Sequence, residues 1–446
     1  MRKPLPHSTE EKTLKKGITT TTTVLLIIAI IAIAGVAWYV LIPPAAPAEK
    51  VIKLGLIFPL TGAQAPFGQD CLKGIQVAID MINAKGGIAG YTVHAVTADS
   101  QSDAAVGASE TERLITFEKV NMVVGSYAGP QCMANSEVAE KYGVPFFEAI
   151  AAPNEATMNR SFRWIFRFGP AGLYYGYVSV DFLVNFLAPA KGWNVTALRI
   201  AVVHESGSYG RSVAAGNLER CEHYGLNVVA HESYSSTATD LSGLITKLNG
   251  LDIDVLLITS YAGDAQLFGR QAHELGFEPK AWIGHSAGWE LPATATALGN
   301  LIIGKYCVGF PLYHTNTTGL LPQVKQDMET FTAMYEARFK GHPASWGAKA
   351  ASAMYQVAFK ALEYAITRYG GIDPESIRKG FLDVDVPEGG TFVGFGCKFN
   401  PPDATNNDWG DNFRATFHPI AQWQGTTADD FVVVWPENLA VAKPLL

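Results

Sequence analysis

The stretch VIKLGLIFPLTGAQAPFGQDCLKGIQVAIDMINAKGG, residues 51 to 87, decides the fold of this chain. Residues 51 to 59 form an apolar run, which predicts a buried strand. After a loop that contains Gly and Pro, residues 67 to 84 place apolar side chains three and four positions apart, which predicts a helix. A buried strand followed by an amphipathic helix is the first unit of a parallel α/β sheet.

The same alternation continues along the chain and then starts again. Residues 91 to 125 predict strand, helix and strand, and residues 200 to 284 predict a second strand-helix series. Between them, FRFGPAGLYYGY at residues 166 to 177 is rich in Gly and aromatic residues and has no periodicity, as in a segment that crosses between two bodies. We therefore expect an α/β fold of two Rossmann-like lobes with parallel sheets, with the ligand beyond the carboxyl ends of the strands.

An apolar run precedes the lobes. Residues 24 to 42 are all apolar or Gly and are about long enough to cross a bilayer. Residues 1 to 23 carry more Lys and Arg than Asp and Glu, which predicts a cytoplasmic N-terminus, and residues 43 to 50 read as a linker. The expectation is an extracytoplasmic body anchored in the membrane by this helix, with a cleaved signal and secretion as the alternative.

Composition excludes several classes of function. The net charge is -7 with 17% charged residues, which argues against a nucleic-acid partner. The five cysteines are far apart, with no CxxC pair, and no Walker loop or zinc-protease motif occurs. We therefore expect no cofactor and no metal.

One short motif is compatible with an enzymatic function. Gly284-His285-Ser286-Ala287-Gly288 matches G-x-S-x-G, the turn that exposes the nucleophile of an exported serine esterase. Asp383 and His418 follow in the required order, but no oxyanion-loop motif precedes the serine and Pro292 falls within the expected helix. The interpretation favoured here is a protein that is not an enzyme.

Several segments resemble one known family, the leucine/isoleucine/valine-type solute-binding proteins of ABC importers, which have the type I periplasmic binding fold. The segments cover nearly all of the chain after residue 50: residues 53 to 103, VVGSYAG at 123 to 129, YGVPFFEAIAAPNEAT at 142 to 157, VVHESGSYGRS at 202 to 212 and IDVLLITSYAGDA at 253 to 265. The resemblance implies two lobes joined by a three-segment hinge. It places lobe 1 at residues 51–168 and 308–392, and lobe 2 at residues 169–307 and 393–446.

The resemblance also implies a ligand site between the lobes. The expected ligand-binding residues come from both series: Phe67, Tyr127, Gly129, Glu148, Ala149, Ala151, Tyr209, Tyr261 and Ser286. Amino-acid binders of the family hold the ligand ammonium with an acidic residue, and Ser286 stands at the matching place. Glu148 or Glu205 is a possible replacement, main-chain N–H groups at Gly129 and Ala151 are possible carboxylate donors, and a ligand without an ammonium group is the alternative.

The function implied by the resemblance is capture of a small molecule by lobe closure and its delivery to the permease of an ABC importer. The expected ligand is a branched-chain or hydrophobic amino acid, or a related aromatic or apolar carboxylate or amide. A ligand-sensing receptor ectodomain of the same fold is the alternative, although no second apolar run follows the lobes before Leu446.

Overall fold

The computed structural model describes residues 20–41, 50–401 and 409–446. The chain separates into two units, residues 1–50 and residues 51–446. Most of the expected cytoplasmic segment, residues 1–19, and most of the expected linker, residues 43–49, lie outside the described residues.

The segment expected to span a membrane forms most of helix α1 (Thr20–Leu41). Among the described residues, however, no helix combines the length and the apolar character that a membrane crossing requires. Four threonines, Thr20 to Thr23, make up the first turn of α1. The predicted transmembrane anchor at residues 24 to 42 is therefore not supported.

The first sheet of the second unit contains five parallel strands in the order β2-β1-β3-β4-β5. Strand β1 is an inner strand between β2 and β3, and its side chains are mostly buried, as expected for a strand covered on both faces. This order is one of the two common doubly wound orders, which bind ligands where the winding direction reverses. The strands are β1 (Val51–Phe58), β2 (Thr92–Asp99), β3 (Met122–Gly125), β4 (Phe146–Glu148) and β5 (Ile165–Arg167).

The second sheet contains seven strands in the order β12-β11-β10-β9-β8-β6-β7. Its five parallel strands, β7-β6-β8-β9-β10, repeat the order of the first sheet. Strand β11 pairs antiparallel with β10 on one side and with β12 on the other, and a short connection joins β11 and β12 as a hairpin. The strands are β6 (Arg199–Glu205), β7 (Asn227–Tyr234), β8 (Val255–Thr259), β9 (Ala281–His285), β10 (Tyr306–Val308), β11 (Ile420–Trp423) and β12 (Phe431–Trp435).

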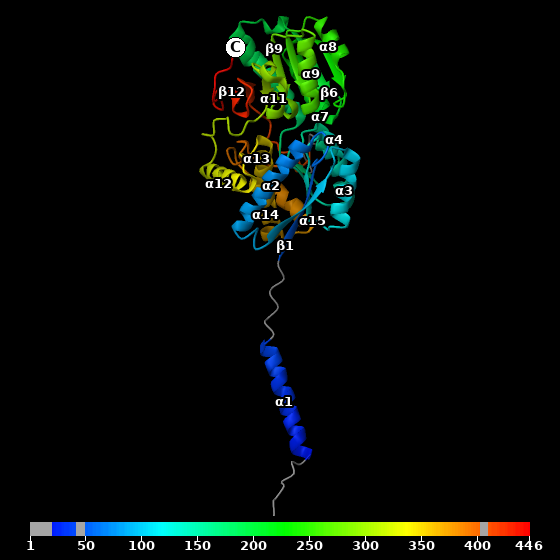
Figure 1. Cartoon of the computed structure of the whole chain (residues 1–446), viewed down its shortest axis with the longest axis vertical. Helices are drawn as coiled ribbons and strands as arrows, with labels where there is room; N and C mark the ends of the chain where they lie inside the picture. The colour runs from blue at the N-terminus through cyan, green and yellow to red at the C-terminus, as the bar shows by residue number, and fades with distance from the viewer. Residues whose placement is uncertain (1–19, 42–49, 402–408) are drawn as a thin grey trace, which may run out of the picture. The chain divides into compact units, whose positions relative to one another are not determined.

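Helices cover both sheets, so that the body forms two lobes (Figure 1). Those of the first lobe are α2 (Ala65–Ala84), α3 (Ala104–Thr116), α4 (Gly129–Tyr142), α12 (Pro322–Phe339), α13 (Ser345–Ser352), α14 (Phe359–Tyr369) and α15 (Pro374–Leu382). Those of the second lobe are α5 (Gly172–Phe182), α6 (Ala188–Lys191), α7 (Ser208–His223), α8 (Ser242–Asn249), α9 (Ala262–Glu274), α10 (Ser286–Trp289) and α11 (Pro292–Leu298). Two π-helical turns, η2 (Leu183–Leu187) and η5 (Ala353–Ala358), interrupt longer helices. The expected α/β fold with parallel sheets is confirmed.

The chain passes between the lobes where the sheets end. It leaves the first sheet at Arg167, leaves the parallel part of the second sheet at Val308, and joins that sheet again at Ile420. The lobe boundaries proposed from the sequence remain a prediction.

A close helix crossing in the first lobe positions α13. A Cβ atom on Gly74 of α2 would lie 1.8 Å from the carbonyl oxygen of Gly347 in α13. Only glycine therefore allows the two helices this approach. The crossing holds Trp346 and Lys349, both on α13, at the edge of the lobe that faces the site described next.

Candidate functional site

The carboxyl ends of both sheets contribute to one cavity. Tyr127 and Gly129 follow β3, and Ala151 follows β4 in the first lobe. In the second lobe, Tyr261 follows β8 and Ser286 follows β9. Parallel strands expose their following loops at one edge of the sheet, so the fold places these residues of distant sequence around one space.

Six of the nine residues expected from the sequence line this cavity. They are Tyr127, Gly129, Ala151, Tyr209, Tyr261 and Ser286. Phe67 stacks on the Tyr127 ring, with 4.8 Å between centroids, and supports the wall from behind. Ala149 lines an adjoining cavity, which shares Ile150, Tyr175 and Trp346 with the first. Their roles in binding stay a prediction.

The walls are aromatic and largely uncharged. The Tyr127 ring meets the Trp346 ring edge to face at 5.6 Å between centroids, and Tyr209 and Tyr261 lie 5.7 Å apart. Burial raises the pKa of the Tyr127, Tyr209 and Tyr261 hydroxyls well above 10, so each stays protonated at neutral pH. Such walls suit a ligand with an apolar or aromatic body.

The cavity is narrow in this conformation. Its volume is about 20 Å³, which is room for about one water molecule. Because residues from both lobes line it, a larger molecule requires the lobes to separate or the aromatic rings to turn.

Glu148 lies beneath the cavity and its carboxylate is already occupied. One oxygen accepts the main-chain N–H groups of Ser126, Ile150 and Ala151 at 2.7, 2.9 and 2.7 Å. The other accepts the Ser126 hydroxyl at 2.9 Å. The Ala151 N–H is thus bonded to Glu148 in this structure. The roles of Glu148 toward a ligand ammonium and of the Ala151 N–H toward a ligand carboxylate stay predictions.

Glu205 has the same arrangement in the second lobe. It ends β6, and its two oxygens accept the N–H groups of Gly207 and Gly210, both at 2.5 Å. Both acids thus order the loops that follow their strands, because a carboxylate accepts several main-chain donors at once.

The Gly129 N–H, the other expected main-chain donor, bonds weakly to the Tyr261 hydroxyl at 3.4 Å.

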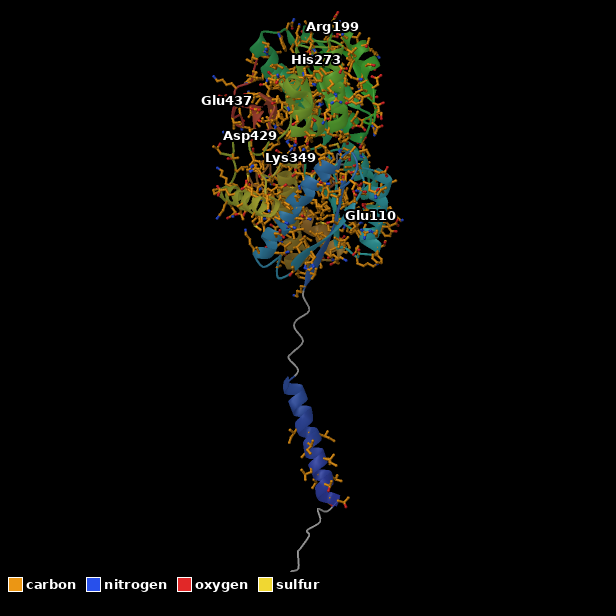
Figure 2. The ribbon with its side chains drawn as sticks, viewed as in Figure 1. Glu110, Arg199, His273, Lys349, Asp429 and Glu437 are labelled. Atoms are coloured by element: carbon orange, nitrogen blue, oxygen red, sulfur yellow. The ribbon has the colours of Figure 1, made fainter. Side chains whose placement is uncertain are left out.

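A buried ion pair near Ser286 was not expected from the sequence. The Lys349 ammonium lies 2.9 Å from a carboxylate oxygen of Glu290, and both side chains are almost fully buried. The other Glu290 oxygen accepts the Ser286 hydroxyl at 3.1 Å and the Phe310 N–H at 3.3 Å. Lys349 comes from α13 and Glu290 follows α10, so the pair joins the two lobes, and Figure 2 labels Lys349 between them. The sequence contains one local indication of this pair, which is that Glu290 lies four residues after Ser286.

Comparison with known proteins agrees with this architecture. The family model described as "Periplasmic binding protein" matches residues 51–407. The chain is 33% identical over 394 residues to "Leu/Ile/Val-binding protein homolog 8" of Brucella abortus (strain 2308), covering 88% of this chain and 92% of the relative. The chain belongs to the periplasmic binding protein family.

Two solved structures of such proteins share the fold. The branched-chain amino acid transporter substrate-binding protein LivJ from Streptococcus pneumoniae, in complex with isoleucine, has a TM-score of 0.67 and 22% identity, covering 89% of this chain and 100% of that one. A solute-binding protein of an ABC transporter from Rhodopseudomonas palustris BisB5, in complex with 3,4-dihydroxy benzoic acid, has a TM-score of 0.63 and 19% identity, covering 84% and 92%. The recognition made from the sequence motifs is confirmed.

The relatives of this periplasmic binding protein are solute-binding proteins rather than enzymes. The esterase alternative also lacks its geometry, because the Ser286 hydroxyl donates to Glu290 rather than to a histidine. Asp383 bonds to Arg368 and Tyr369, and His418 packs against the Tyr175 ring. The described part of the chain contains no group of three His, Cys, Asp or Glu side chains able to hold a metal, and all five cysteines are buried and free.

Proposed function

We propose that this periplasmic binding protein is the solute-binding component of an ABC importer. It captures a branched-chain or hydrophobic amino acid, or a related aromatic or apolar carboxylate or amide, between its lobes. The observation that carries the proposal is the aromatic cavity to which the carboxyl ends of both sheets contribute. Closure of the lobes then presents a compact liganded form to the permease.

The relatives support the ligand range. The names of the compared proteins include a Leu/Ile/Val-binding homologue, an isoleucine complex and a 3,4-dihydroxy benzoic acid complex. Aliphatic and aromatic side groups both suit the tyrosine walls, since an aromatic ring contacts either by its face or its edge.

A thermal-shift screen tests the binding step. The full chain is screened with amino acids, aromatic acids and amides, and a ligand at 100 times its Kd stabilises the folded state by about 2.7 kcal/mol. Tyr261→Ala removes a wall of the cavity and should abolish the shift, whereas Tyr142→Ala, on the outer surface of α4, should keep it.

Two further measurements test closure and transport. Small-angle scattering should show a smaller radius of gyration with the ligand found in the screen, and an unchanged radius at saturation would contradict closure. Loss of uptake of that ligand on deletion of the gene tests the link to an importer.

A further inference from the structure

Hydrogen-bond donors without acceptors surround the cavity. In the described part of the chain, the Tyr127 hydroxyl and the Trp346 indole nitrogen are buried with no hydrogen-bond partner. Both residues line the cavity. An indole N–H can only donate, and a buried donor left unpaired costs free energy. The indole N–H therefore requires an acceptor on the ligand, and the Tyr127 hydroxyl, which can donate or accept, is free to donate to the same acceptor.

The acids near the cavity are committed to other partners. Glu148 and Glu205 accept main-chain N–H groups, and Glu290 accepts Lys349, Ser286 and Phe310. No acidic residue lines either of the two adjoining cavities in the described part of the chain. An ammonium group enclosed here would thus have no counter-charge facing it.

Asp264 is a rival partner for a ligand ammonium. One of its oxygens accepts the Tyr234 hydroxyl at 2.9 Å, and the other is buried without a partner. It lies in the first turn of α9, behind Tyr261, and is not among the residues that line the cavities.

Lys349 supplies a positive charge at the cavity. It lines the adjoining cavity, and its ammonium lies 4.3 Å from the centroid of the Trp346 ring. Glu290 takes one of its three donors. The Trp346 ring therefore contacts both the Tyr127 ring and the Lys349 ammonium, so the three donor residues lie side by side. His418, whose Nδ1 is buried and unpaired, lines the same cavity as Lys349.

We propose that the cleft selects a carboxylic acid with an apolar or aromatic body and no amino group, and that Lys349, Trp346 and Tyr127 donate to its carboxylate. The inference rests on the proposed function and narrows its ligand class. A lysine that shares its charge between Glu290 and a ligand carboxylate is stabilised by both, because charge-assisted hydrogen bonds are stronger than neutral ones. The ammonium group of an amino-acid ligand, in contrast, carries the same charge as Lys349 and is repelled by it.

Matched ligands test this on the wild-type full chain by calorimetry. Each pair differs only in the amino group: leucine against 4-methylpentanoate, and phenylalanine against 3-phenylpropanoate. We expect each acid to bind at least tenfold more tightly than its amino acid, and 3-phenylpropanoate to bind more tightly than 3-phenylpropanamide.

Several results with these ligands would overturn the proposal. Equal or tighter binding of the amino acids means that the cleft accommodates an ammonium. Equal binding of the amide means that Lys349 contributes no charge. If none of these compounds binds while another solute raises the melting temperature, this inference fails and the proposed function stands; if no solute of any class binds, both fail.

A paired variant tests Lys349 directly. Lys349→Met combined with Glu290→Gln removes both charges without leaving one unpaired, and we expect about a hundredfold weaker binding of 3-phenylpropanoate. Lys305→Met is the matched control, because Lys305 also lies over a tryptophan ring, that of Trp282 at 4.2 Å, away from the cleft. Unchanged affinity in the paired variant would overturn the role of Lys349, and leucine binding that is lost in Asp264→Asn would assign an ammonium site to Asp264. If the paired variant does not fold, the wild-type ligand pairs decide.

Discussion

The two lobes share a strand order but contribute opposite charges to the space between them. Each has a glutamate at the carboxyl end of a parallel strand, Glu148 in the first lobe and Glu205 in the second, and each carboxylate is turned into its own loop. Charge between the lobes comes from other elements: Lys349 from α13 of the first and Glu290 after α10 of the second. The difference shows that an acid at a strand end can order a loop, while the charged groups that face the other lobe come from a helix, α13, and from the end of another, α10.

The interlobe ion pair gives the largest expected effect. Lys349→Met leaves Glu290 as a lone buried charge, and we expect the free energy of unfolding to fall by about 3–5 kcal/mol. Chemical denaturation measures this loss. The added change Glu290→Gln should restore most of it, since no charge is then left unpaired. If the double variant is as unstable as the single one, the two residues do not act as a pair across the lobes.

The two strand-end acids should differ in proportion to the donors they hold. Glu148→Ala leaves three buried N–H groups without an acceptor, and we expect a loss of about 3 kcal/mol in unfolding free energy. Glu205→Ala leaves two N–H groups, with an expected loss of about 2 kcal/mol. Denaturation curves of both variants test the order. A Glu148→Ala variant that keeps its stability and loses ligand binding would instead make Glu148 a ligand contact.

A pH effect should arise from Asp264 in the second lobe. Burial raises the pKa of Asp264 to about 7. The folded state therefore holds this proton between about pH 4 and 7, whereas the unfolded state does not, so stability falls as pH rises through that window. Between pH 5 and 7 we expect the wild type to lose about 2 kcal/mol more than Asp264→Asn. Equal slopes of unfolding free energy against pH in the two proteins would show that Asp264 does not titrate with folding.

The smallest expected effect concerns the aromatic wall of the first lobe. Phe67→Leu removes the stack on Tyr127, and we expect ligand affinity to fall by about 1 kcal/mol, roughly fivefold. Calorimetry with the ligand found by screening measures the change, and Phe117→Leu, on the exposed end of α3, is the control. A larger loss would mean that Phe67 contacts the ligand itself rather than supporting Tyr127.

The sequence alone determined the parts of this protein that depend on local pattern. Apolar runs and helical spacing predicted the strands and helices of both lobes, since the spacing of apolar residues along an element determines which of its faces is buried. The resemblance to the solute-binding family then implied that Tyr127, Tyr209 and Tyr261 gather at one site, and these three residues do line one cavity. The sheet pattern by itself indicated only the edge where the site lies, because the carboxyl ends of parallel strands share an edge.

Only the tertiary structure decided where the charges go. The direction of the Glu148 carboxylate depends on main-chain N–H groups that come together only after folding. The periodicity of the sequence does not predict where these groups lie. Glu290 and Lys349 lie 59 residues apart on elements of different lobes, so their pairing follows from how the lobes meet. Local pattern determines which residues are buried, but a buried charge takes its partner from whatever the fold brings within hydrogen-bond distance.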